Sequence, residues 1–242
     1  MPIPSAIEPG AWSSRPKLWS FGRVLQLVAS LGLWVAAVFV SAGTPDWLRG
    51  WICVIATLAM YAVAVVLMQR RNPALLEARA RWRHRDTKSF DKVFVALLLP
   101  LFFAQPVVAG LDAARFRWTS MPFGTVYIGL AFLMLGMALV TWAMLVNPYA
   151  ETTVRIQTER QHQTVTAGPY SIVRHPMYVG AIAMFPATAL IFGSLWAFVI
   201  GLLMDTLLVW RTAMEDRTLR RELPGYEQFS SSTRYRLLPG VW

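Results

Sequence analysis

The apolar block MYVGAIAMFPATALIFGSLWAFVIGLLMDTLLVW, residues 177–210, decides the fold of this chain. It is longer than the roughly 20 residues that one membrane span needs, and Gly193-Ser194 interrupts it near its middle. The two arms, of about 16 residues each, are short for crossing a bilayer alone. We therefore expect a helical hairpin that enters and leaves the membrane on one face, rather than a single long tilted helix.

Four further apolar runs precede this block, and none of them contains Asp, Glu, Lys or Arg. They cover residues 24–41, 50–68, 93–111 and 122–146. Each is about the length that a bilayer core requires. Trp47, Trp51, Trp118 and Tyr149 lie near the ends of these runs, as expected for interfacial anchors. The sequence predicts an all-α integral membrane protein, a bundle of four spans plus a C-terminal helical hairpin, in one domain over residues 1–242.

The composition supports a lipid-embedded chain. Hydrophobic residues make up 56% and charged residues 15%, against about a quarter charged in a typical soluble domain. The net charge of +10 could suggest a nucleic-acid partner. However, the basic residues lie between long apolar runs, so we expect the bilayer as partner, and no nucleic acid. The single Cys53 and the separated His84, His162 and His175 predict no disulfide framework and no metal site.

The distribution of basic residues predicts the orientation. With four spans and a hairpin, three of the 23 Lys and Arg residues, Arg49, Arg115 and Arg117, lie on one side, which leaves 23 − 3 = 20 on the other. By the positive-inside rule the basic side, which carries both termini, is cytoplasmic. Eight of its basic residues lie in the 69–92 loop, including Arg79, Arg81, Arg83 and Arg85. We interpret this loop as a topology determinant resting on acidic head groups rather than as a binding patch.

Polar residues collect after the fourth span. Gly168-Pro169-Tyr170 is a turn signal, and His175 precedes Pro176, which suits the first turn of the hairpin helix. The unpaired N–H groups of that helix start favour an anionic ligand group. No glycine-rich dinucleotide motif and no P-loop is present. The sequence therefore predicts a ligand site at the membrane surface that is of neither nucleotide-binding type.

A second polar group follows the return arm of the hairpin. Arg211 and Glu215 are four residues apart and so share a helix face, either as an exposed ion pair or as part of a site. A hairpin that returns to its starting face would bring them beside His175. Asp205, inside the arm, does not share the face of Arg211, and we expect it to be a packing or polar-network residue.

These segments resemble the isoprenylcysteine carboxyl methyltransferase family. The resemblance covers roughly residues 72–242 and includes stretches common in bacterial members, which implies a bacterial inner membrane. Its specific element is Arg174-His-Pro-Met-Tyr-Val-Gly180 together with Arg211-x-x-x-Glu215. It implies a membrane helical bundle with a catalytic region over 147–242, a cytoplasmic cofactor pocket closed by the C-terminal tail, and a lipid substrate that arrives from the bilayer.

The cofactor implied by the resemblance is S-adenosyl-L-methionine. Carried over by position, its contacts would come from Gln157, His162, Gln163, Thr164, Val165, Tyr170, His175, Pro176, Met177, Tyr178 and Glu215. Arg211 would bind the substrate, and Arg211 and Glu215 would be the catalytic pair. The family usually has Glu-Glu where this chain has Glu215-Asp216, which leaves the role of Asp216 open.

The implied reaction is methyl transfer to a lipophilic or small-molecule acceptor, with a carboxylate favoured because it is ionised at neutral pH and needs no general base. Arg211 would hold the carboxylate, while Glu215 would balance the positive cofactor or hold Arg211 in place. One alternative is a phospholipid-amine or small-thiol methyltransferase, which would need a base such as His162 or Glu215. Two further alternatives are an NADPH-dependent membrane reductase similar to sterol reductases and a membrane scaffold without catalysis.

Overall fold

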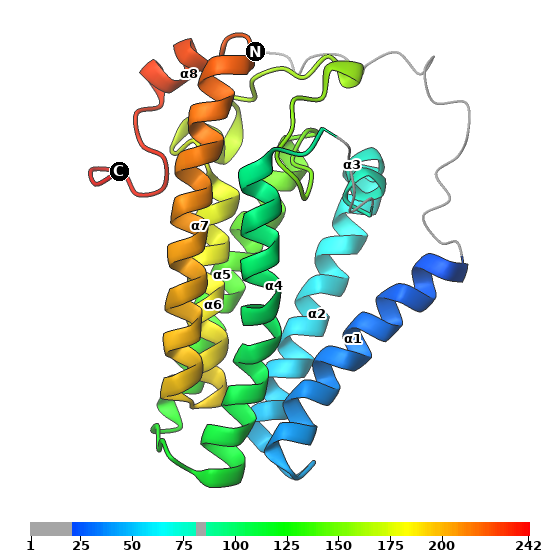
Figure 1. Ribbon diagram of the computed structural model, residues 1–242, viewed down its shortest axis with the longest axis vertical. Helices are drawn as coiled ribbons and strands as arrows, with labels where there is room; N and C mark the ends of the chain where they lie inside the picture. The colour runs from blue at the N-terminus through cyan, green and yellow to red at the C-terminus, as the bar shows by residue number, and fades with distance from the viewer. Residues whose placement is uncertain (1–20, 81–85) are drawn as a thin grey trace.

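The computed structural model describes residues 21–80 and 86–242, and all regular elements within these ranges are helical (Figure 1). Five of the helices are long and apolar enough to cross a membrane. The long elements are α1 (Phe21–Ala42), α2 (Leu48–Arg71), α4 (Ser89–Ala109), α5 (Gly124–Val146), α6 (Pro176–Phe192) and α7 (Leu195–Glu222). The short ones are α3 (Pro73–Arg79), the π-helix η2 (Gly110–Phe116), the 3-10 helices η3 (Thr158–Arg160) and η4 (Gly168–Ser171), and α8 (Tyr226–Ser232). The predicted all-α membrane class is confirmed.

The four predicted spans correspond to α1, α2, α4 and α5, with small shifts at their ends. The chain crosses the bundle four times and leaves residues 147–175 at the same end as residues 72–80 and 86–88 (Figure 1). We call this the basic end, and the end that carries residues 43–47 and 117–123 the opposite end. The third span continues past the predicted residue 111 into η2, which ends where Arg117 adopts a left-handed conformation with φ 54°.

The predicted hairpin is confirmed as α6 and α7. Gly193, with φ +80°, ends α6, and Ser194 caps α7 by accepting a hydrogen bond from Ala197 N at 3.0 Å. The turn lies at the opposite end, because Gly193 packs directly against the guanidinium of Arg49, which also donates to Thr125 Oγ1 at 3.2 Å. Both arms therefore run the full depth of the bundle and meet again at the basic end.

The expectation that each arm is short for crossing is wrong for α7. The predicted block stopped at Trp210, where charged residues begin, but the helix continues to Glu222. The sequence RTAMEDRTLRRE that follows Trp210 consists largely of strong helix formers. Arg211, Thr212 and Asp216 on this extension are buried, so it belongs to the packed interior rather than to a frayed end. The extension carries the predicted catalytic residues.

Helices α5 and α6 pack very closely through glycines. A Cβ atom added at Gly180 would lie 2.5 Å from the carbonyl oxygen of Gly136, and one added at Gly136 would lie 2.6 Å from that of Gly180. About two turns before Gly136 on α5, a Cβ atom added at Gly129 would lie 2.7 Å from the carbonyl oxygen of Ala187. Small residues at such contacts let membrane helices approach at backbone distance. This contact fixes the start of α6, where the site begins.

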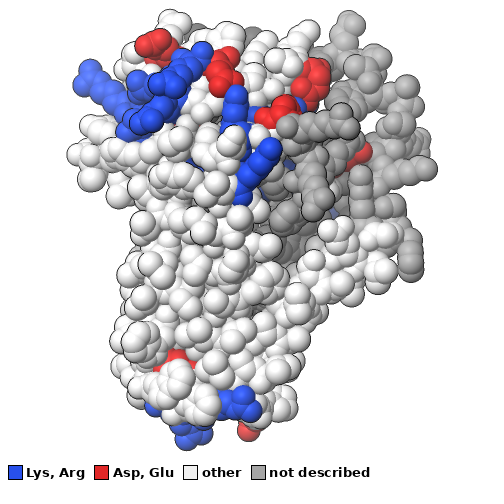
Figure 2. Space-filling view, in the orientation of Figure 1, with Lys and Arg blue, Asp and Glu red and all other residues white. Residues whose placement is uncertain are grey.

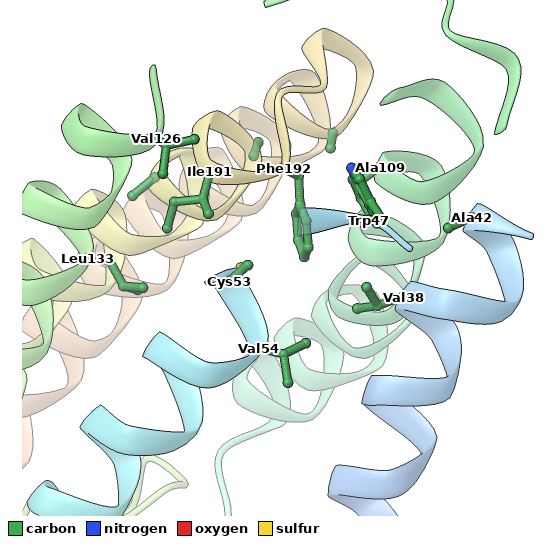
Figure 3. Close-up of a cluster of buried hydrophobic side chains, with 13 residues drawn as sticks. Val38, Ala42, Trp47, Cys53, Val54, Ala109, Val126, Leu133, Ile191 and Phe192 are labelled. Carbon is green, nitrogen blue, oxygen red and sulfur yellow. The ribbon is translucent and has the colours of Figure 1, made fainter. Parts of the chain in front are cut away.

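The hydrophobic core at the opposite end joins the first two helices to the hairpin turn (Figure 3). Trp47 stacks on Phe192 with ring centroids 5.4 Å apart, and Val38 and Cys53 are fully buried around them. Cys53 is therefore the small buried hydrophobe that the sequence suggested. The hairpin is anchored at its turn and leaves its open end to form the site.

Charged side chains gather at the two ends of the molecule and leave an apolar middle (Figure 2). Within that middle, Gln105 donates to the carbonyl oxygens of Phe185 at 2.8 Å and Ala197 at 3.2 Å, and so ties α4 to the hairpin. Asp205 is half-buried, and its Oδ1 has no hydrogen-bond partner in the described part of the chain, so a polar network around it is not supported. Arg81, Arg83, His84 and Arg85, which entered the sequence-based predictions, lie outside the described residues.

Candidate active site

A polar cavity lies at the basic end, between the open end of the hairpin, the 147–165 segment, η4 and α8. Ten of the residues predicted from the sequence line it: His162, Gln163, Thr164, Val165, Tyr170, His175, Met177, Tyr178, Arg211 and Glu215. The hairpin therefore brings His175 into one cavity with Arg211 and Glu215, as its topology predicts. Tyr226 and Phe229 of α8 complete the wall, so the C-terminal region borders the cavity.

Two predicted residues lie outside the cavity wall. Gln157 is buried behind it, where its Nε2 donates to the carbonyl oxygen of Tyr149 at 2.7 Å and its Oε1 accepts from Arg160 at 2.8 Å. Pro176 occupies the first position of α6, where the missing N–H of proline costs no hydrogen bond. Their positions suit residues that shape the loop and the helix start.

Asp216, whose role the sequence left open, is the centre of a buried ionic cluster. Its side chain is 1% exposed and accepts from Arg174 Nε at 2.7 Å, Arg236 Nε at 2.9 Å and Tyr226 Oη at 3.0 Å. His175 Nε2 lies 3.4 Å from the same carboxylate. Two guanidiniums and a hydroxyl offset the cost of burying this charge. Asp216 therefore connects α7 to the start of the hairpin and to the C-terminal tail.

The C-terminal tail is held on the Arg174-His175 segment by backbone pairing. Arg174 N donates to Tyr235 O at 2.9 Å, and His175 N donates to Arg236 O at 3.0 Å. Arg174 Nη1 also donates to the carbonyl oxygens of Thr233 at 2.8 Å and Arg234 at 2.7 Å. The arginine and histidine of the motif thus attach the tail that borders the cavity.

Arg211 is buried and paired with an acid that the sequence analysis missed. Its Nε donates to Asp91 Oδ1 at 2.7 Å and its Nη2 donates to Thr152 O at 2.9 Å, while its guanidinium lies over the rings of Phe94 and Tyr178. Asp91 is 0% exposed, and its Oδ2 accepts from Val154 N at 2.8 Å. In the sequence, Asp91 is distinguished only as a single acid just before the apolar run over residues 93–111. Asp91 fixes the guanidinium at the cavity wall.

Glu215 does not pair with Arg211, although both lie on α7 four residues apart. Its carboxylate accepts a hydrogen bond from the hydroxyl of Tyr178. The ring of Tyr178 stacks parallel to the ring of His175, with the ring centroids 5.6 Å apart. The carboxylate that contacts the Arg211 guanidinium directly is Asp91, so the role of holding Arg211 in place, one of the two expected for Glu215, is not supported by a direct contact. Glu215 remains a half-buried negative group that faces the cavity.

Two residues of the cavity wall, His162 and Tyr170, have shifted pKa values. Burial, with a contribution from nearby Arg160, lowers the pKa of His162 to about 4, and its ring packs on Tyr149 with centroids 4.5 Å apart. Burial raises the pKa of Tyr170 to about 12, and its hydroxyl accepts from Asn147 Nδ2 at 3.1 Å. Both side chains are therefore neutral around pH 7.

A second, apolar cleft adjoins the polar cavity and lies between the long apolar helices. Side chains of α1, α2, α4, α5 and the hairpin line it, among them Met68, Val140 and Leu208. The two spaces share the residues Met177, Tyr178 and Arg211 in their walls. A molecule with an apolar tail in the cleft would therefore present its polar end beside Arg211.

The residues that line the polar cavity match S-adenosyl-L-methionine in charge and polarity. Glu215 offers negative charge for a sulfonium group, and Leu219 and Phe229 offer an apolar wall for a base. No group of three or more metal-ligating side chains occurs among residues 21–80 and 86–242.

Comparison with known proteins agrees with this geometry. Residues 125–224 match the family model described as phospholipid methyltransferase, a segment that runs from the start of α5 to just past the end of α7. No curated protein matches the chain. The match confirms the resemblance drawn from the motifs: residues 125–224 are similar to membrane methyltransferases of the isoprenylcysteine carboxyl methyltransferase-like family.

Proposed function

We propose that this chain uses S-adenosyl-L-methionine to methylate the carboxylate of a lipophilic acceptor at the membrane surface. The observation that carries the proposal is the junction of the two spaces at Met177, Tyr178 and Arg211. A polar cavity suited to a charged cofactor and an apolar cleft suited to a lipid tail meet at one guanidinium. Such a junction supports a reaction between a water-borne and a membrane-borne partner.

The cofactor, when bound, would supply a methyl group on a positively charged sulfonium. Glu215 would lower the energy of that positive charge in the cavity, and the hydroxyl of Tyr178 would hold the Glu215 carboxylate in a fixed orientation. The backbone pairing of the tail with Arg174 and His175 would keep water out. Orientation and exclusion of water are the contributions that this reaction needs from the protein.

The acceptor carboxylate would bind at Arg211. Nε of Arg211 donates to Asp91 and Nη2 donates to Thr152, whereas Nη1 makes no hydrogen bond in the described structure. A guanidinium has five N–H donors, so donors remain for a ligand. A carboxylate with a pKa of about 3.3–3.7 is already ionised at neutral pH and needs no base.

A phospholipid amine is the second candidate acceptor, and the description of the matched family favours it. An amine is protonated at neutral pH and needs a base before it can attack. His162, with a pKa of about 4, is a weak base, which leaves Glu215 for that task. We therefore rank the carboxylate first.

An NADPH-dependent reductase is less well supported. The 2′-phosphate of NADPH needs a cation that is not already neutralised. Arg155 pairs with Glu151, Glu159 and Asp86, Arg174 pairs with Asp216, and Arg211 pairs with Asp91. Arg155 and Arg174 are therefore taken up by carboxylates, and Arg211, whose Nη1 remains available in the described structure, lies where the polar cavity meets the apolar cleft.

We also propose that the basic end faces the cytoplasm, in the inner membrane of a bacterium. The excess of Lys and Arg at that end supports this orientation. The cofactor cavity would then open toward the compartment in which S-adenosyl-L-methionine is made.

Purified protein in detergent tests the proposal. Calorimetry is expected to detect binding of S-adenosyl-L-methionine and S-adenosylhomocysteine and no binding of NADPH. Transfer of a radiolabelled methyl group is then followed to a fatty acid, a prenylated cysteine and phosphatidylethanolamine. A methyl ester releases volatile methanol in base, whereas a methylated amine does not. Base-stable label in phosphatidylethanolamine alone would replace the carboxylate with the amine, and binding of NADPH alone would refute methyl transfer.

A further inference from the structure

We propose that Arg79 and Arg211 form a two-arginine clamp for the acidic head group of a lipid whose tail lies in the apolar cleft. This inference rests on the proposed function, because it describes how the acceptor would be recognised. It assigns a binding role to a residue of the 69–92 loop, which the sequence alone presents as a topology determinant.

Arg79 is the last residue of α3, and its side chain lines the same cleft as Arg211. Its Nη1 donates to the carbonyl oxygen of Ala150 at 2.6 Å. Among residues 21–80 and 86–242, no carboxylate lies within ion-pair distance of it. Arg79 is half-buried, and this burial lowers the pKa of its guanidinium. A half-buried cation without a described acid partner is stabilised by an anionic ligand.

The other arginines of this region differ from Arg79 in one of two ways. Arg155, Arg174 and Arg211 are buried but carry carboxylate partners. Arg70 and Arg71 at the end of α2 are exposed and line neither space. Arg79 combines a place in the cleft wall with the lack of a described acid partner. A cation that served only to set topology would not need to face the cleft.

The remaining wall of the cleft indicates what kind of molecule carries the anion. Met68, Met144 and Met184 come from α2, α5 and α6, and the other lining residues are mostly aliphatic or aromatic. Methionine side chains adapt to irregular apolar shapes, so this wall suits a flexible hydrocarbon chain. A single-chain lipid with an acidic head group satisfies both the apolar wall and the two guanidiniums. Its head would lie at Met177 and Tyr178, where the cleft meets the polar cavity.

Equilibrium binding of lipids to the full-length protein in a neutral detergent, without S-adenosyl-L-methionine, tests the clamp. The probes are oleate, lysophosphatidic acid and methyl oleate, which has the same tail but no charge. Wild-type protein is expected to bind at least one of the two acids tenfold or more tightly than methyl oleate. Arg79→Gln is expected to remove roughly tenfold or more of that affinity, the effect of one charge-assisted hydrogen bond, and to leave methyl oleate unchanged.

The matched control is Arg71→Gln, which removes an exposed charge from the same end and should bind all three probes as the wild type does. Arg79→Lys retains the charge and should recover most of the affinity for acids. Tighter binding of oleate assigns a carboxylate head group, and tighter binding of lysophosphatidic acid assigns a phosphate. Either result supports the clamp.

The proposal is overturned if wild-type protein does not prefer an acid over methyl oleate, or if Arg79→Gln weakens all three probes equally. The first comparison needs no variant, so it holds even if Arg79→Gln does not fold. Because no cofactor is present, the result is separate from the fate of the proposed function. Absence of methyl transfer would not alter the expected binding, and loss of the clamp would leave cofactor binding intact.

Discussion

Arg211 Nε on α7 donates to Asp91 Oδ1 on α4 at 2.7 Å, and both side chains are buried where the polar cavity meets the apolar cleft. The pair joins α4 to α7 through two residues that are 120 positions apart in the sequence. It holds a positive group at the cavity wall, and Nη1 of that group, which makes no hydrogen bond in the described structure, would remain for the proposed acceptor.

Arg211→Ala is expected to lower methyl transfer at least 100-fold and to change the affinity for S-adenosyl-L-methionine by less than about threefold, because charged hydrogen bonds to a substrate are each worth roughly 1.5–3 kcal/mol. The substitution also leaves Asp91 buried without its cation, at a cost of about 3–5 kcal/mol. The double variant Asp91→Asn/Arg211→Ala removes both charges and should recover part of the Tm without recovering activity. Normal turnover by either variant would contradict the role of Arg211.

Asp216→Asn is expected to loosen the C-terminal tail. The substitution removes the negative charge that Arg174 and Arg236 share, so about 3–5 kcal/mol of stability is lost. Limited proteolysis should then cut after α8 at lower protease concentration, and the affinity for S-adenosyl-L-methionine should fall. Asp46→Asn, at an exposed acid of the opposite end, is the matched control and should change neither measurement. Unchanged proteolysis of Asp216→Asn would show that the tail is held by its backbone pairing alone.

His162 predicts a pH dependence of stability. Burial favours its neutral form in the folded state, so its pKa there, about 4, lies below the value of about 6.5 expected in the unfolded chain. The unfolded chain therefore binds more protons between these values, and stability should fall as the pH drops from about 6.5 to about 4. Tm measured across this range should fall less steeply for His162→Gln. Gln163→Ala alters a neighbouring cavity residue that does not titrate, and it should keep the wild-type slope.

The spans and the hairpin could be predicted from the sequence because a bilayer excludes charge, which leaves long uncharged runs as a direct trace of each helix. The meeting of His175 with Arg211 followed from the hairpin topology. The roles of Asp91, Asp216 and Arg79 could not be predicted in this way. Each depends on contacts between residues far apart in the chain, and neither periodicity nor local spacing records which distant partner a buried charge finds.

Gly180 and Gly136 supply a last prediction, which links the helix packing to the site. A Cβ at Gly180 would lie 2.5 Å from Gly136 O and 2.7 Å from Val140 Cγ2, so Gly180→Ala must push α6 away from α5. Tyr178 and Met177 lie within one turn of Gly180, and their displacement would disturb the junction of the two spaces. We expect a lower Tm in detergent and at least a tenfold loss of methyl transfer, because small misplacements of reacting groups are costly. Gly32→Ala in α1, where nothing lies within 4 Å of the added Cβ, should leave both unchanged, since alanine is the better helix former. Equal behaviour of the two variants would show that α6 can shift without moving the residues it carries into the site.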